Sequence, residues 1–204
     1  MTTYSLPLFP LNTVLFPQGV LPLRIFEARY LDMVRACLRH KTQFVIVAVT
    51  DENTVKNDGM PFADIGTACI IMDVDVTEIG LMNIRCMGEK KVRIKTATQQ
   101  VDGLWIAELE DIALEPLMAI PEDLTLAQEY LQQLIDSLIK QDIEETYMPL
   151  TKPFLMDDCG WVANRWSEIL SMPLIQKQRM LALDSPLIRL ELVQDLLNSE
   201  FTKH

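Results

Sequence analysis

The sequence predicts an α+β fold in which an antiparallel β-barrel with one helix is followed by a C-terminal helical bundle. Three features predict it: a proline-punctuated apolar opening, a period of two in the segments between residues 65 and 110, and a repeat of three and four from about residue 121 onward. No Gly- or Ser-rich linker separates these parts. We therefore expect two subdomains packed together, a barrel over residues 1–118 and a bundle over residues 119–204.

The opening is apolar, but it does not fit a membrane anchor. No charged side chain occurs from Met1 to Leu23, and this segment contains four prolines, Pro7, Pro10, Pro17 and Pro22. Each proline removes a backbone donor and would break a spanning helix. The basic segment and the small-residue cleavage site of a signal peptide are both missing. Short apolar runs separated by proline and by Gln18-Gly19 instead predict edge strands joined by tight turns.

One helix and one buried strand follow the opening. Residues Glu27 to Arg39 predict a helix, because apolar side chains recur on one face. Glu27 falls in its first turn, where the helix dipole favours an anion. Phe44 to Val49 is a continuous apolar run, which is typical of a fully buried strand. The polar stretch from Asp51 to Gly59 predicts a loop.

Further short strands then alternate with turn residues. The predicted strands are Ile65–Val76, Met82–Met87, Lys91–Lys95 and Leu104–Glu110. The predicted turns lie at Gly80, Gly88 and Asp102-Gly103. Such a series of antiparallel neighbours around one helix predicts a small closed or half-open barrel.

Helices occupy the remainder of the chain. Pro121 can begin the first, with Glu122 and Asp123 at its positive dipole end. The others are predicted over Trp161–Leu170, over Pro173–Leu183 and from the cap Asp184-Ser185-Pro186 to about Leu197.

The composition argues against polyanionic partners. The net charge is −11, with 11 basic against 15 acidic residues through Met118 and 7 against 14 afterwards. Both halves therefore repel nucleic acids and anionic membranes at long range, and we expect neither as a partner.

The cysteines do not predict a metal site. Cys37, Cys69, Cys86 and Cys159 form no C-x-x-C pair, and the histidines are His40 and His204. Reduced cysteines acting as small core residues of a cytoplasmic protein account for this pattern. We expect no metal and no cofactor.

Two segments resemble a known family. The first, Leu6 to Tyr30, reads L-P-L-F-P-L-N-T-V-L-F-P-Q-G-V-L-P-L-R-I-F-E-A-R-Y and closely resembles the opening of the Lon protease N-terminal substrate-binding domain. The second, Ala163 to Val193, resembles the helical part of that region. The resemblance implies a PUA-like β-barrel and a role in recognising unfolded substrates and in assembly.

The residues required for Lon chemistry are not found in the sequence. A Lon protease needs a G-x-x-x-x-G-K-[ST] phosphate loop and a Ser–Lys dyad, which lie outside this domain. The seven glycines include no G-x-G and no phosphate-loop spacing. His40 is interpreted as a solvated residue at a helix end and not as a general base. We therefore expect no catalytic residues and no enzymatic activity.

Three charged residues, Arg24, Glu27 and Arg29, stand close together in an apolar setting. In the structural interpretation, which we favour, Glu27 pairs with one of the arginines and locks the strand-to-helix corner. In the functional interpretation, an arginine faces a groove and binds a backbone carbonyl or a chain-terminal carboxylate of a peptide. Asn12 has the same two interpretations, and turn formation is favoured.

Two residues beside the polar loop are candidates for exposed, adaptable contacts. Most of the eleven methionines are expected in the core, but Met60 and Phe62 adjoin the loop and could contact apolar partners.

The expected function is binding without chemistry. We expect a free-standing relative of the Lon domain that holds unfolded or apolar peptide segments, or a protein partner, in a shallow groove formed by Arg24, Phe26 and Tyr30 with their neighbours. One alternative is a small-molecule-binding or catalytic barrel with a pocket between the subdomains. Another, less favoured, is RNA binding through Lys90–Lys95, which lacks interleaved aromatic residues. The oligomeric state stays open.

Overall fold

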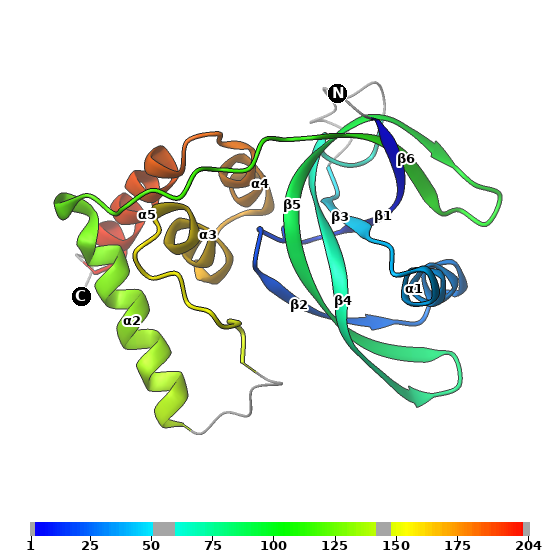
Figure 1. The fold of residues 1–204 in the computed structure, drawn as a ribbon, viewed down its shortest axis with the longest axis horizontal. Helices are drawn as coiled ribbons and strands as arrows, with labels where there is room; N and C mark the ends of the chain where they lie inside the picture. Colours follow the sequence, from blue (N-terminus) through cyan, green and yellow to red (C-terminus); the bar gives the residue numbers. More distant parts are fainter. Residues whose placement is uncertain (1–2, 51–59, 142–147, 202–204) are drawn as a thin grey trace. The chain divides into compact units, whose positions relative to one another are not determined.

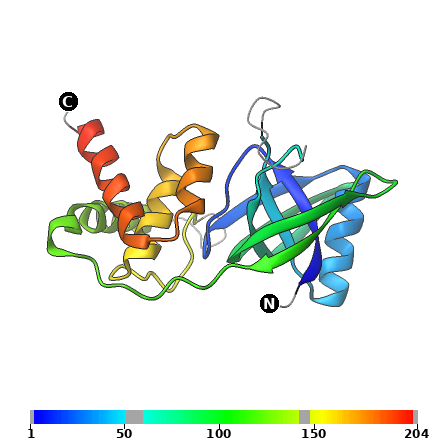
Figure 2. The ribbon, with the colours of Figure 1, turned by 90° about the horizontal axis from the view of Figure 1, so that it is seen from above.

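The structure is a computed structural model that describes residues 3–50, 60–141 and 148–201. The predicted loop from Asp51 to Gly59 lies outside the described residues. The chain divides into two compact units, Met1–Leu114 and Glu115–His204, which Figures 1 and 2 show as a strand-rich and a helical part. Within the described ranges, no helix is both long and apolar enough to cross a membrane.

The first unit contains six strands and one helix. In chain order these are β1 (Tyr4–Leu11), β2 (Val20–Ile25), α1 (Ala28–His40), β3 (Phe44–Ala48), β4 (Ile65–Glu78), β5 (Leu81–Gln99) and β6 (Trp105–Asp111). The predicted helix and the predicted buried strand are confirmed as α1 and β3, and every residue of β3 is buried. Figure 1 shows β4 and β5 as one long, curved hairpin.

The strands form one six-stranded sheet in the order β2-β5-β4-β3-β1-β6, in which β5 also pairs with β6. The pairings therefore run in a closed cycle from β5 through β4, β3, β1 and β6 back to β5. The prediction of an antiparallel barrel is wrong at one pairing, because β1 and β3 pair in parallel, whereas the other pairings are antiparallel. The intervening β2 and α1 return the chain to the same end of the sheet, so that β3 runs in the direction of β1.

Three of the four prolines of the opening lie where a strand has one partner, and the fourth, Pro17, lies in a turn. Pro22 belongs to β2, which pairs only with β5 among the described strands. Within β1, Pro7 lies in the half that pairs with β6, and Pro10 lies in the half that pairs with β3. A missing N–H is tolerated there because it can face the side without a ladder.

Gly88 is not a turn residue, and the two strands predicted on either side of it are one strand. β5 runs unbroken from Leu81 to Gln99, with β2 paired to Met82–Met87 and β6 paired to Val92–Gln99. A Cβ atom at position 88 would lie 2.4 Å from the backbone oxygen of Phe16. Glycine is required here by a close approach between backbones.

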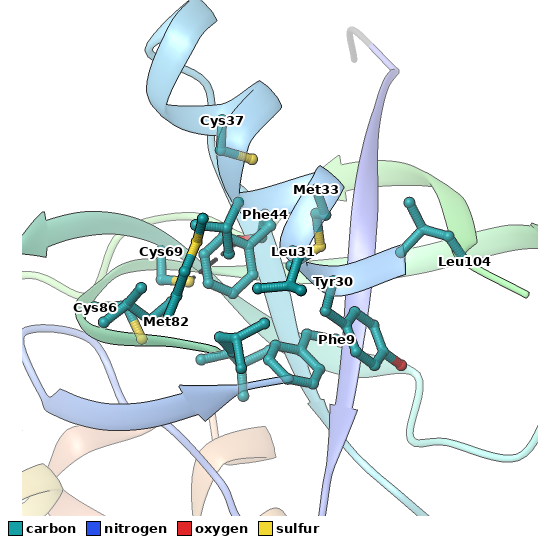
Figure 3. Packing of buried hydrophobic residues seen from close by; sticks show 14 of the residues in the cluster. Phe9, Tyr30, Leu31, Met33, Cys37, Phe44, Cys69, Met82, Cys86 and Leu104 are labelled. Atoms are coloured by element: carbon teal, nitrogen blue, oxygen red, sulfur yellow. Dashed lines mark hydrogen bonds between the residues drawn. The ribbon is translucent and has the colours of Figure 1, made fainter. Parts of the chain in front are cut away.

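The core of the first unit lies between α1 and the sheet (Figure 3). It joins the buried face of α1, including Tyr30, Leu31 and Val34, to side chains such as Phe9 and Phe44 from the strands. Cys37, Cys69 and Cys86 belong to this cluster, and Cys159 is buried in the second unit. All four cysteines are free thiols, as predicted.

The second unit contains four α-helices and a short 3₁₀ turn among its described residues. They are η2 (Glu122–Leu124), α2 (Thr125–Lys140), α3 (Cys159–Ile169), α4 (Leu174–Ala182) and α5 (Pro186–Phe201). Asp158 caps α3 by accepting the N–H of Trp161 at 2.8 Å, and Ser185 does the same for α5 through Ile188 at 3.3 Å.

A buried arginine connects the segments of the second unit. Arg189 of α5 is 1% exposed and forms a two-pronged ion pair with Glu115, with N–O distances of 2.6 and 2.9 Å. It also donates to Asn164 Oδ1 and to the carbonyl oxygens of Met180 and Leu183. These five hydrogen bonds satisfy all five N–H donors of the guanidinium.

Candidate functional site

A groove of about 480 Å³ opens at one end of the first unit, where several strands begin or end. The ends of β1, β2 and β5, the start of β6, the residue after β3 and the start of α1 all contribute to it. The lining side chains are mainly apolar or aromatic: Phe9, Pro10, Leu11, Ile25, Phe26, Tyr30, Val49, Pro61 and Trp105. The polar members are Arg24, Glu27, Arg29 and Gln99.

Arg29 is fixed in the wall of this groove. Its Nε and Nη2 donate to the same carboxylate oxygen of Glu27 at 3.0 and 2.7 Å. Its Nη1 donates to the carbonyl oxygen of Gly103 at 2.9 Å. The arginine therefore ties the start of α1 to the β5–β6 turn, and the predicted pairing of Glu27 with a neighbouring arginine is confirmed.

Glu27 lies just before the helix and not in its first turn as predicted. Its backbone is extended, with φ −75° and ψ 133°, and its carbonyl accepts the N–H groups of Tyr30 and Leu31. Its side chain forms no capping hydrogen bond. The carboxylate is directed to Arg29 instead of to the helix N–H groups.

Arg24 has a different environment. It is the penultimate residue of β2, and its side chain is exposed. No hydrogen bond or ion pair of this side chain is found among the described residues. Because Glu27 is already paired with Arg29, the guanidinium of Arg24 gives the groove a local positive charge on a protein whose net charge is −11.

Four aromatic side chains line the groove: Phe9, Phe26, Tyr30 and Trp105. The rings of Phe9 and Tyr30 stack with centroids 4.1 Å apart, which links the groove to the hydrophobic core (Figure 3). Trp105 packs edge-to-face on Phe62 with centroids 5.3 Å apart. Phe26, by contrast, is 68% exposed and presents its ring to solvent. The groove thus combines fixed aromatic surfaces with one free aromatic side chain.

The environment of Tyr30 in the groove changes the pKa of its hydroxyl group. Burial raises the pKa of its hydroxyl above the usual value, and the positive charge of Arg29 offsets part of this increase. The guanidinium carbon of Arg29 lies 4.7 Å from the centre of the Tyr30 ring, which adds a cation–π contact.

The structure brings five of the eight predicted site residues together. Arg24, Phe26, Glu27, Arg29 and Tyr30 all line the groove.

The three other predicted residues are not among the lining residues. Asn12 is exposed in a bend after β1, and Met60 is half-buried next to Pro61. The expectation that Phe62 is exposed is wrong, because it is 0% exposed. An isolated bridge between Val49 and Phe62 draws it beneath Trp105, so that it supports the groove wall without facing the groove.

Sequence comparison identifies the family. Residues 5–199 match the ATP-dependent protease La (LON) substrate-binding domain. The chain belongs to this family. No curated protein matches the sequence.

Solved structures of Lon N-terminal domains have a similar fold. A Lon N-terminal domain protein from Xanthomonas campestris is 29% identical, with a TM-score of 0.74 over 93% of this chain and 96% of that one. The N-terminal domain of the Mycobacterium avium complex Lon protease is 17% identical, with a TM-score of 0.61 over 94% of this chain and 97% of that one.

Several groove residues of this Lon substrate-binding domain could not be found from the sequence. Phe9, Val49 and the pair Gln99 and Trp105 come from three distant parts of the chain and meet only because β1, β3 and the β5–β6 hairpin end together. The one local signal is the Asp102-Gly103 turn, which places Gln99 and Trp105 on either side of a hairpin. The parallel pairing of β1 with β3, which aligns Phe9 with Ile46, has no such signal.

Proposed function

We propose that the groove at the end of the first unit binds an extended apolar segment of an unfolded or flexible polypeptide, without chemistry of its own. The observation that carries this proposal is the exposed ring of Phe26 beside a groove lined mainly by apolar side chains. A large apolar side chain left in water next to an apolar groove favours contact with another apolar surface. Membership in the substrate-binding family supports the same function.

Arg24 is the residue of the proposed site that can select a carboxylate of the bound peptide. Its guanidinium has no partner among the described residues and lies on the groove rim, so it can form two parallel hydrogen bonds to a carboxylate. We propose that it pairs with a carboxylate of the bound peptide, either the chain terminus or an acidic side chain. Arg29 is already engaged and positions the groove wall.

We also propose that the first unit is a PUA-like barrel and that the second is a helical bundle. The closed cycle of strand pairings supports a PUA-like barrel, and the helices of residues 115–204 support a bundle. β2 has one strand partner among the described strands and ends at the groove, so its free edge could add main-chain hydrogen bonds to an extended peptide. Pro22 limits that pairing, because it lacks an N–H.

Charge pairing supports a protein partner over RNA. The candidate RNA-binding strand carries Lys90, Arg93 and Lys95, which form ion pairs with Asp111, Asp64 and Glu110 respectively. The positive charge of this strand is therefore offset locally by carboxylates, and phosphate groups would compete with them.

The proposal is tested by peptide arrays followed by titration of selected peptides with the whole chain. Phe26→Ala is expected to weaken binding at least about fivefold, since it removes an anchor without touching the core. Ile79→Ala is the matched control, because Ile79 is also an exposed apolar side chain but lies at the β4–β5 turn. Failure of all unfolded and apolar peptides to bind, or equal effects of the two variants, would refute the proposed site.

Three peptides that share one apolar sequence and differ in their carboxylates test the proposed role of Arg24. One apolar peptide is prepared with a free C-terminal acid, with a C-terminal amide, and as an amide with one internal Asp. Arg24→Gln should leave the second peptide unaffected: a selective loss with the first peptide identifies the chain terminus as the bound carboxylate, and a selective loss with the third identifies the acidic side chain. Equal affinities for all three peptides would remove the role of Arg24 and leave apolar binding in place.

A further inference from the structure

A second groove lies between α4 and α5 of the second unit, and it shares no residue with the groove of the first unit. Its volume is about 440 Å³. It is lined by residues of both helices and by the residue that precedes α4: Met172, Gln176, Arg179, Met180, Leu192, Asp195, Leu196 and Ser199. Most of the exposed lining is apolar, and none of the predicted functions uses it.

An apolar row on α5 continues along the groove. Ile188, Leu192 and Leu196 are spaced by four residues and so lie on one side of the helix. Ile188 and Leu192 are exposed, whereas the opposite side of α5, with Leu190, Val193 and Leu197, is fully buried. The helix therefore has two apolar sides, and only one of them is used within the unit.

Two unpaired charges of opposite sign line the groove. Arg179 lies on α4 and Asp195 lies on α5. Neither side chain has an ion-pair or hydrogen-bond partner in the part of the chain that the structure describes. A surface that presents an apolar groove, an adjacent apolar row and one charge of each sign can complement a rotated copy of itself.

We propose that this groove is the interface of a two-fold symmetric dimer with a second copy of this chain. The α5 row of each copy packs into the groove of the other copy, and each Arg179 pairs with Asp195 of the second copy. This arrangement buries the exposed α5 row of each copy, and it gives Arg179 and Asp195 of each copy an ion-pair partner. An unrelated helix would need to supply an apolar row and two matched charges at the same spacing.

The mass of the whole chain, measured by sedimentation equilibrium across the micromolar to millimolar range, tests the dimer. Arg179→Asp and Asp195→Arg are each expected to weaken self-association roughly tenfold or more, because each places two like-charged pairs in the interface. A mixture of the two variants should dimerise again, since both pairs are then of opposite sign. Only contact between copies produces this recovery.

A substitution in the apolar row and a matched control complete the test. Leu192→Asp should weaken self-association roughly 100-fold, because it places a charge in the centre of the interface. Ile139→Asp, at an exposed position of α2 outside the groove, should leave self-association unchanged. Circular dichroism checks that each variant folds. A monomeric wild type over the whole range, an unaffected Leu192→Asp variant, or a mixture without recovery would overturn the proposal.

Discussion

The guanidinium of Arg29 donates two hydrogen bonds to one carboxylate oxygen of Glu27, two residues earlier in the chain. This contact divides the charged residues of the groove into two kinds. Glu27 and Arg29 neutralise each other and hold the start of α1, while Arg24 has no ion-pair partner among the described residues and is the arginine that we propose binds a peptide carboxylate. Structural and binding roles are therefore separable by substitution.

Arg29→Ala should lower the free energy of unfolding by about 1–2 kcal/mol, through loss of a partly exposed ion pair and of the hydrogen bond to Gly103. Arg24→Ala should leave it within about 0.5 kcal/mol, because the side chain is exposed. Urea denaturation measures both. Equal losses in the two variants would contradict the division of roles.

Gly103→Ala should destabilise the chain more than Gly80→Ala does. Both glycines have a left-handed backbone conformation, with φ of +85° and +84°. Alanine at either site therefore lowers the free energy of unfolding by about 1 kcal/mol. At position 103 the new Cβ would also lie 2.7 Å from Nη1 of Arg29, whereas at position 80 it meets open space. Displacing Arg29 costs its hydrogen bonds, which adds up to about 1 kcal/mol.

The Arg29→Ala background provides the control for that comparison. With the guanidinium removed, Gly103→Ala should cost only as much as Gly80→Ala, because backbone strain alone remains. If the extra cost persists in the double variant, the contact with Arg29 is not its source.

Local sequence patterns predicted the elements and the antiparallel partners joined by short turns, but not the pairings between strands that are distant in sequence. The spacing of apolar residues identified α1 and β3 because each buries one repeating surface. Gly88 was misread because a glycine between two alternating segments is usual in turns. Its actual role depends on Phe16, which is distant in sequence. Likewise, Arg24, Glu27 and Arg29 were found because they are neighbours in sequence, whereas Val49 and Trp105 join them only through strand pairing.

Gly88→Ala tests this reassignment. The added methyl would lie 2.4 Å from the Phe16 carbonyl oxygen and 2.9 Å from Cγ2 of Thr67, so the backbone of β5 must shift. We expect a loss of roughly 2–4 kcal/mol in the free energy of unfolding, measured by urea denaturation. If Gly88 were in a flexible turn, Gly88→Ala would lower the free energy of unfolding no more than Gly80→Ala does. That result would contradict the close approach between Gly88 and the Phe16 backbone.

The raised pKa of Tyr30 predicts a loss of stability in alkali. Burial favours the neutral phenol in the folded state, so the folded pKa lies above the unfolded one. The contribution of the neutral Tyr30 phenol to the free energy of unfolding is complete below the unfolded pKa of about 10, and it is lost as the pH rises through the higher folded pKa. Wild type should therefore lose more stability than Tyr30→Phe above this pH. Parallel stability curves for the two proteins would contradict the shift.

Arg189 should be the most sensitive residue of the second unit. Its five N–H donors bind Glu115, Asn164 and two carbonyl oxygens in a buried site. Arg189→Ala leaves these acceptors without donors and should cost about 3–5 kcal/mol. Arg189→Lys keeps the charge but offers three donors from one point, and should still cost roughly 2 kcal/mol. In a Trp105→Phe background, tryptophan fluorescence reports only on Trp161 and Trp166 of this unit during denaturation. A lysine variant as stable as its parent would show that charge alone, without the planar donor geometry, holds Glu115 in place.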